Sequence, residues 1–135
     1  MANPHISFVT IGVKDLERMS VFYRDTLGWQ MEKEEQGVRF FKMNPGLILA
    51  LFGEQDLAED IGLKDWRPDD QDSFKRMSLA INLPSKEAVD SYFELLQNKG
   101  VTIQKAPQSV FWGGYNGYFK DPEDNYWEVA YNPFL

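Results

Sequence analysis

The order of predicted elements repeats along the 135-residue chain, and this repeat limits the fold more than any single motif does. In the first half, a buried strand at 6–13 precedes a helix that begins at Asp15 and ends at Gly28. Turn signals then separate three short strands, at 30–34, 38–43 and 47–52. The first half therefore predicts a βαβββ unit.

The second half has the same order of elements. A strand at 77–83 precedes a helix that Ser85 caps and Gly100 ends, and three strands follow at 101–104, 114–119 and 126–131. The sequence predicts an α+β fold, in which one domain consists of two βαβββ modules with curved mixed sheets that enclose a cleft. The modules are residues 1–53 and 75–135, and an acidic linker with a short helix, residues 54–74, joins them.

The composition excludes several classes of protein. A net charge of −7 without a basic cluster argues against nucleic acid as a partner. No run approaches the roughly 20 apolar residues of a membrane span, and the start of the chain does not resemble a signal peptide, so we expect a cytoplasmic protein. Because the chain has no cysteine, it has no disulfides and no thiolate metal site.

Two segments carry a resemblance to a known family. ISFVTIGVKDLERMSVFYRDTLGW, residues 6–29, resembles the opening module of the vicinal oxygen chelate superfamily, which holds glyoxalases, bleomycin-resistance proteins and extradiol dioxygenases. GYFKDPEDNYWEVAYNPF, residues 117–134, resembles its closing hairpin, F-x-D-P-D-G-N-x-x-E. Asp124 stands where that turn usually has glycine, and aspartate tolerates the left-handed backbone better than most residues. The resemblance implies a homodimer.

In metal-dependent members, the resemblance implies four ligands, one from the first and one from the last strand of each module. The matching positions here are Phe8, Ala50, Ser78 and Glu128, so only Glu128 keeps a ligand. The one histidine, His5, lies three residues before Phe8 and so falls on the opposite face of the strand. One carboxylate does not hold a divalent ion, and we therefore expect neither a metal nor another cofactor.

Glu128 then needs another role, because a carboxylate in an apolar stretch is costly unless it is paired or bound. Alternation along the strands places small, aromatic and polar residues around Glu128, as in a ligand pocket. The predicted ligand-binding residues are Phe8, Thr10, Ala50, Phe52, Ser78, Asn82, Trp112, Tyr115, Tyr126 and Glu128. No Lys, Arg or His falls in this predicted lining.

Two points on this pocket stay open in the sequence. Trp112 and Tyr115 flank two glycines and suit a loop that closes over the mouth of the pocket, although the tryptophans could equally cap the ends of the sheets. Glu128 could instead be a buried acid that is hydrogen-bonded to Tyr126, Asn82 or Ser78 with no ligand.

Two functions follow from this reading. The first is a binding protein without the usual metal site, which would hold a small aromatic or cationic molecule against Glu128, since ring faces and a carboxylate both attract positive charge. The second is an enzyme that acts on a small oxygenated substrate with Glu128 as metal ligand or general base. It would be a glyoxalase-like lyase or isomerase, or a relative of the dioxygenases. The predicted lining offers no basic group to stabilise an enediolate, and this favours the binding protein.

Overall fold

A computed structural model describes residues 3–68 and 74–135, so the last part of the predicted linker, residues 69–73, lies outside the described residues. Contacts divide the chain into two compact units, residues 1–70 and 71–135. Each unit is described by itself. Within the described ranges, no helix has both the length and the apolar character needed to cross a membrane.

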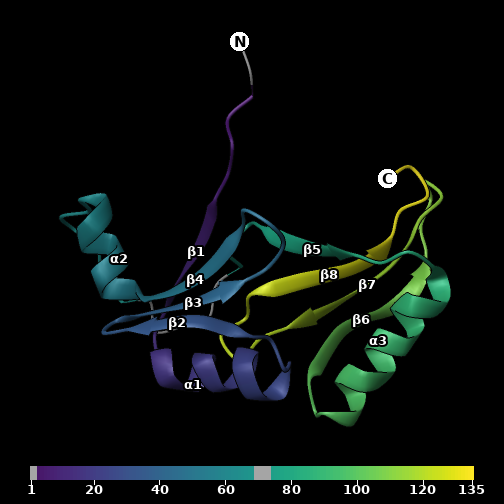
Figure 1. The fold of residues 1–135 in the computed structure, drawn as a ribbon, viewed down its shortest axis with the longest axis horizontal. Helices are drawn as coiled ribbons and strands as arrows, with labels where there is room; N and C mark the ends of the chain where they lie inside the picture. The colour runs from purple at the N-terminus through teal and green to yellow at the C-terminus, as the bar shows by residue number, and fades with distance from the viewer. Residues whose placement is uncertain (1–2, 69–73) are drawn as a thin grey trace. The chain divides into compact units, whose positions relative to one another are not determined.

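The first unit is a four-stranded mixed sheet with helices (Figure 1). The strand order is β1-β4-β3-β2, in which β1 and β4 are parallel and the other pairs are antiparallel. Its elements are β1 (Phe8–Val13), α1 (Leu16–Val21), the π-helical turn η1 (Phe22–Thr26), β2 (Met31–Glu35), β3 (Val38–Lys42), β4 (Ile48–Gly53) and α2 (Glu54–Ile61).

Helix α1 begins where the sequence predicts, because the Asp15 carboxylate accepts a hydrogen bond from the backbone N–H of Arg18 at 3.0 Å. Met19 of α1 and Tyr23 of η1 are completely buried, and the Tyr23 ring lies 6.0 Å from that of Phe41 on β3. The buried Leu49 and Leu51 of β4 complete this core, as their alternation predicts.

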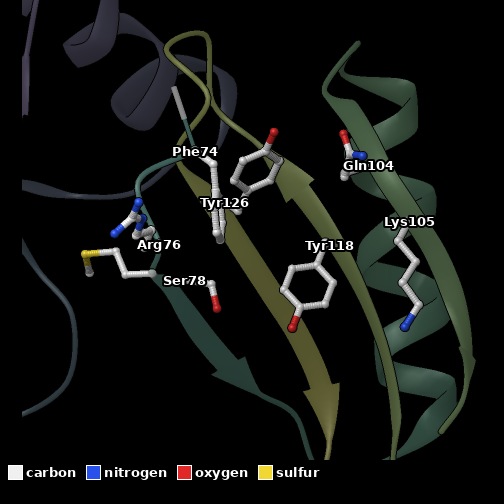
Figure 2. A pocket seen from close by; sticks show the side chains of 8 residues that line it. Phe74, Arg76, Ser78, Gln104, Lys105, Tyr118 and Tyr126 are labelled. Carbon is white, nitrogen blue, oxygen red and sulfur yellow. The ribbon is translucent and has the colours of Figure 1, made fainter. Parts of the chain in front are cut away.

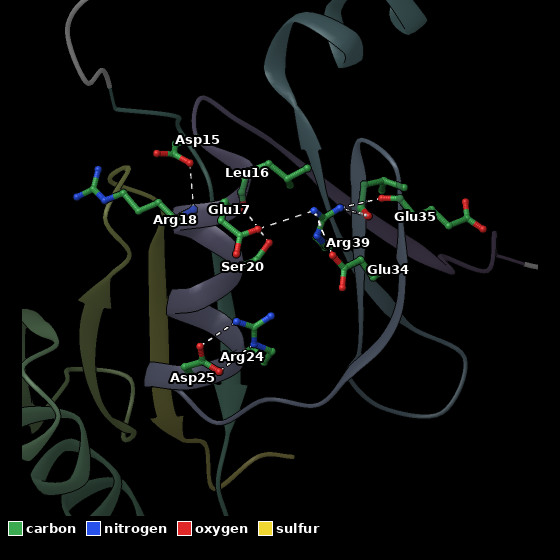
Figure 3. A network of polar contacts seen from close by, with 11 residues as sticks. Asp15, Leu16, Glu17, Arg18, Ser20, Arg24, Asp25, Glu34, Glu35 and Arg39 are labelled. Atoms are coloured by element: carbon green, nitrogen blue, oxygen red, sulfur yellow. Dashed lines mark hydrogen bonds and ion pairs between the residues drawn. The ribbon is translucent and has the colours of Figure 1, made fainter.

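Arg39 links the β2–β3 hairpin to α1 (Figure 3). Its guanidinium donates to the carbonyl oxygens of Glu35 and Val38 at 2.8 and 3.0 Å. The carboxylates of Glu34 and Glu17 lie 3.4 and 3.9 Å away, and the Arg39 side chain is only 13% exposed. Arg39 therefore has a structural role, because its guanidinium is paired within the first unit.

The second unit repeats the topology with the strand order β5-β8-β7-β6 and a parallel β5–β8 pair (Figure 1). This α+β fold with two four-stranded mixed sheets is the one that the sequence predicts. The elements of the second unit are β5 (Ser78–Asn82), α3 (Lys86–Asn98), β6 (Thr102–Ser109), β7 (Tyr115–Lys120) and β8 (Tyr126–Tyr131).

Helix α3 covers one face of this second sheet. The Ser85 hydroxyl caps it by accepting from the backbone N–H of Ala88 at 3.0 Å, as predicted. The buried Phe93 lies so close to Gly117 of β7 that a Cβ at Gly117 would stand 2.7 Å from the ring. The same Cβ would stand 2.7 Å from the backbone oxygen of Lys105, so the glycine permits the close approach of α3, β6 and β7.

Strand β6 is longer than the predicted strand at 101–104, because it continues through Pro107 to Ser109. The strand lies at the edge of the sheet, where a proline that lacks an N–H group leaves no neighbour without a hydrogen bond. Its register with β7 shifts twice, between Ile103 and Lys105 and again between Lys105 and Gln108. These shifts change which β6 side chains reach each face.

The turn between β7 and β8 forms as predicted. Asp124 takes the left-handed conformation with φ of 61°, so aspartate replaces the family's glycine without loss of the turn. One oxygen of the buried Asp121 carboxylate accepts from the backbone N–H groups of Glu123 and Asn125, both at 2.9 Å. The turn thereby fixes where β8 begins.

Candidate ligand-binding site

The face of the second sheet that points away from α3 carries the candidate site. On β8, Trp127 and Val129 are buried on the α3 side, so Tyr126 and Glu128 point to the other face. The register pairs Ser78 with Tyr126 and Ala80 with Glu128, which brings β5 and β8 side chains together on that face. We call it the concave face.

A pocket of about 600 Å³ lies on the concave face, and its side chains come from all four strands and from the segment before β5 (Figure 2). Two predicted site residues, Ser78 and Tyr126, belong to it. The full lining consists of Phe74, Arg76, Met77, Ser78, Gln104, Lys105, Tyr118 and Tyr126. The lining predicted from the sequence contained no basic residue, whereas this pocket is lined by both Arg76 and Lys105.

Glu128 belongs to a polar chain on the same face. One of its carboxylate oxygens accepts a hydrogen bond from the Asn116 amide nitrogen at 2.7 Å. The Asn116 amide oxygen accepts in turn from the Lys105 ammonium at 3.0 Å. Asn116 is only 6% exposed, so this amide holds a carboxylate and an ammonium apart while it pairs with each. In the alternative reading of the sequence, Glu128 was a buried acid bonded to Tyr126, Asn82 or Ser78, whereas the structure pairs it with Asn116.

Tyr118 lines the pocket and is the register partner of Glu128. Burial raises the pKa of Tyr118 and the negative charge of Glu128 raises it further, while a hydrogen bond with Ser78 acts in the opposite direction. The Lys105 ammonium lies 5.9 Å from the centre of the Tyr118 ring. The phenol is therefore neutral near pH 7 and can donate or accept a hydrogen bond.

The structure places Trp112 and Tyr115 away from this pocket. The Tyr115 hydroxyl donates to the Asp90 carboxylate on α3 at 2.6 Å, so its side chain lies on the other face of the sheet. The Trp112 indole folds over Gly114, where an added Cβ would overlap the ring. Two backbone hydrogen bonds of 3.0 Å close the turn between β6 and β7: Val110 N–H donates to the Gly114 oxygen, and Gly113 N–H donates to the Val110 oxygen. Neither Trp112 nor Tyr115 lines the pocket.

Asn82 and the four predicted residues of the first unit also lie outside the pocket lining. Asn82 is exposed on β5, opposite Ala130. In the first unit, the register pairs Phe8 with Ile48, Thr10 with Ala50, and Gly12 with Phe52. The rings of Phe8 and Phe40 meet edge to face at 5.9 Å across β4, and Ala50 is only 2% exposed. The buried Ala50 is therefore not available to a ligand in this unit.

Several residues of the site were not predicted from the sequence: Phe74, Arg76, Met77, Gln104, Lys105, Asn116 and Tyr118. Period-two alternation along the predicted strand at 114–119 could have found Asn116 and Tyr118, because Gly117 and Phe119 face α3. Lys105 lies one residue beyond the predicted strand at 101–104, next to a register shift, and no comparable signal marked it.

The residues at the four positions that the resemblance matches to the family's metal ligands do not fit a metal ion. Phe8 and Ala50 have no donor atom, and Ser78 offers only a neutral hydroxyl. Glu128 is the single anionic donor, and it is already bonded to Asn116. Across residues 3–68 and 74–135, no group of three or more His, Cys, Asp or Glu side chains is placed to hold an ion.

Comparisons with known proteins agree with this architecture. A glyoxalase-related enzyme from Fulvimarina pelagi is 30% identical over 95% of this chain and 88% of that one, with a TM-score of 0.79. A glyoxalase/bleomycin resistance protein/dioxygenase from Nocardioides is 26% identical over 97% and 85% of the two chains, with a TM-score of 0.82. A lactoylglutathione lyase from Agrobacterium tumefaciens, 22% identical over 96% and 95%, shares the fold with a TM-score of 0.74.

No curated protein sequence matches the chain. The family model described as Glyoxalase/Bleomycin resistance protein/Dioxygenase superfamily matches residues 5–129, which is most of the chain. The resemblance found in the two sequence segments is therefore confirmed along the whole fold, and the chain belongs to the glyoxalase/bleomycin resistance protein/dioxygenase superfamily.

Proposed function

We propose that the chain binds a small organic molecule on the concave face of the second unit, without the metal site of the family. The observation that carries this proposal is the 600 Å³ pocket beside Glu128. Its volume lies within the roughly 300–1,000 Å³ that is usual for small-molecule sites. The combination of aromatic rings with a few convergent polar groups is also typical of such sites.

The rings favour the aromatic part of the earlier expectation. Phe74, Tyr118 and Tyr126 line the pocket, and flat rings contact another ring at low cost in conformational entropy. Removing about 200 Å² of ring surface from water is worth roughly 5 kcal/mol before the cost of association. Apolar contact alone therefore gives weak binding, and a useful affinity needs the polar groups of the pocket.

Glu128 is the proposed polar anchor next to the pocket. Asn116 occupies one of its carboxylate oxygens and is its sole hydrogen-bond partner among the described residues. The side chain is only partly buried, so the other oxygen remains available to a ligand. An anchor of this kind binds directly to a donor group on the ligand or orders water against it.

The test is a screen for small molecules that raise the melting temperature, followed by affinity measurements with variants. Binding should weaken in Tyr126→Ser, which removes a ring from the pocket, and in Glu128→Gln, which removes only the charge of the anchor. Tyr115→Phe is the matched control, because Tyr115 lies on the α3 face. Affinity that is indifferent to Glu128→Gln contradicts the anchor, and affinity that is indifferent to Tyr126→Ser contradicts the site.

A second candidate function gains support from Lys105. The sequence offered no basic group to stabilise an enediolate, whereas the structure puts an ammonium in the pocket and connects it to Glu128 through Asn116. Glu128 would take a proton from the carbon next to a substrate carbonyl, and the electron pair would move to the carbonyl oxygen near Lys105. The similar Fulvimarina pelagi protein is described as an enzyme.

This second candidate predicts proton exchange that the binding protein does not. In D₂O, the chain should replace the hydrogen next to the carbonyl of a small 2-hydroxy ketone with deuterium, as followed by proton NMR. Glu128→Gln should abolish the exchange. No exchange above the rate without protein, across a panel of such ketones, leaves binding as the function.

We also propose, from the family resemblance, that the protein is a homodimer in the cytoplasm. Light scattering coupled to size-exclusion chromatography tests the first part directly. A mass close to twice the 15.7 kDa of the chain supports the dimer. A mass of one chain over the whole concentration range contradicts it.

A further inference from the structure

We propose that the ligand of this pocket is an aromatic acid, whose ring lies on Tyr118 and Tyr126 and whose carboxylate is bound by Lys105, with Arg76 as a second cation at the opposite side. The inference rests on the proposed binding function, but it uses Glu128 to fix Asn116 and Lys105 rather than as a direct contact of the ligand. It narrows that function to one class of ligand and reverses the sign of charge that the acidic composition suggested.

Lys105 is held in position by the fold. Its ammonium donates to the Asn116 amide oxygen at 3.0 Å and lies 5.9 Å from the Tyr118 ring centre. An ammonium has three N–H donors, so two remain for a ligand. Because Asn116 is buried and is fixed by Glu128, the cation stays next to the aromatic floor of the pocket.

Arg76 provides a second positive charge from the segment before β5. Its guanidinium has no hydrogen bond or ion pair with any residue of the described ranges, although it lines the pocket. Its backbone has φ of 61°, the left-handed region that non-glycine residues rarely adopt. Such a conformation at a pocket residue is a feature typical of binding sites.

The spacing suits a ring flanked by two cations. Arg76 precedes β5 and Lys105 lies on β6, at the two edges of the sheet, with β8 and β7 between them. Three strand spacings of about 4.8 Å separate these edges by about 14 Å, and the long basic side chains can reach inward from both. Tyr126 and Tyr118 occupy the two middle strands, so the aromatic floor lies between the positive charges (Figure 2).

The charge of the pocket differs from that of the chain. The whole protein carries −7, yet the eight lining residues include two cations and no acid. Glu128 lies outside the lining and is bonded to Asn116. Arg76 and Lys105 are therefore the charged groups that a ligand in this pocket would contact directly. An aromatic ammonium would meet like charges there, while an aromatic carboxylate would meet opposite ones.

Three probes with one ring system test this inference: 2-naphthoate, the neutral 2-naphthamide, and the 2-naphthylmethylammonium cation. Affinities are measured by saturation-transfer NMR and calorimetry. We expect 2-naphthoate to bind about tenfold more tightly than the amide and the ammonium probe to bind more weakly still, because a hydrogen bond to a charged group discriminates by at least that factor. Higher salt should weaken binding of the acid selectively.

Variants locate the charge that selects the acid. Lys105→Met should remove most of the tenfold preference, and Arg76→Gln, which removes the more distant charge, should lower the preference by about twofold. Arg76→Gln leaves the Asn116 hydrogen bonds intact, so it still tests the inference if Lys105→Met folds poorly. Lys99→Met is the matched control, because this exposed lysine ends α3 on the other face of the sheet.

Each outcome decides between the inference and the function on which it rests. An acid preference that both pocket variants lower, Lys105→Met more than Arg76→Gln, and that the control keeps supports the aromatic acid. Equal binding of the three probes overturns the inference but leaves ligand binding in place, and so does a preference that neither pocket variant changes. No binding of any probe overturns both the inference and the proposed aromatic-binding function.

Discussion

Asn116→Ala should destabilise the second unit more than any substitution of an exposed asparagine, because Asn116 makes two hydrogen bonds to charged groups. One joins the Lys105 ammonium to its amide oxygen at 3.0 Å, and the other joins its amide nitrogen to the Glu128 carboxylate at 2.7 Å. Bonds of this type are worth roughly 1.5–3 kcal/mol when they are buried. Water replaces part of each here, since Lys105 and Glu128 are only partly buried.

Taking about 1 kcal/mol for each bond, the free energy of unfolding should fall by about 2 kcal/mol. For a chain of this length, that corresponds to a drop of roughly 6–8 °C in melting temperature. Urea unfolding followed by tryptophan fluorescence measures the change, because Trp127 is buried in the same unit. Asn82→Ala is the matched control on the same sheet face, and it should change the free energy by less than about 0.5 kcal/mol.

A double-mutant cycle separates the bond from other effects of the substitution. With Glu128→Ala as the second change, the coupling free energy between Asn116 and Glu128 should be about 1 kcal/mol. A coupling within about 0.3 kcal/mol of zero would show that the two side chains do not interact in solution, and the polar chain would then not support the site.

The remaining predictions concern packing, titration and metal content. Gly117→Ala should lower the free energy of unfolding by about 1–3 kcal/mol, because its Cβ would meet the backbone of β6. Gly114→Ala should lower it less and mainly alter the fluorescence, because its Cβ displaces the Trp112 ring. Equal losses of free energy in the two variants would refute this distinction. The pKa of Tyr118 should lie above the ordinary 10.0 and fall back in Glu128→Gln, as ultraviolet titration would show, and an unchanged value would contradict the charge effect. Because the raised pKa favours the neutral phenol in the folded chain, its contribution to stability should persist below pH 10 and be lost as the pH rises through the folded value. Protein purified without chelator should carry less than about 0.1 equivalent of zinc, nickel, manganese or iron, since the donor set does not fit these ions, and a stoichiometric metal would show that the ligand positions were assigned wrongly.

The regular parts of the site could be predicted because side chains alternate strictly along a strand. Counting in steps of two placed Ser78, Tyr126 and Glu128 on one face, and their register partners confirm that they share it. The same alternation predicts that Leu49 and Leu51 lie on the helix-facing side of their strand, and both are buried. The N-caps of the helices could also be predicted, since Asp15 and Ser85 both accept the hydrogen bonds that their positions predict.

Prediction failed where the chain departs from that alternation. Two register shifts in β6 decide that Lys105 reaches the pocket, and no local pattern encodes them. The sequence also gives no sign of the left-handed backbone of Arg76, because that conformation is expected at a glycine and not at an arginine. The position of Trp112 and Tyr115 beside two glycines suits a closing loop but leaves open other roles, because tertiary packing sets their contacts with Gly114 and Asp90.

Chemical-shift mapping with 2-naphthoate on ¹⁵N-labelled protein tests most directly whether the concave face of the second unit binds a ligand. Saturable shifts should concentrate in the amides of residues 76–78, 104–105, 118 and 126, which line the pocket. Shifts concentrated instead in the first unit, at the smaller pocket formed by residues 13–14, 53–56, 66 and 68, would contradict this assignment of the site.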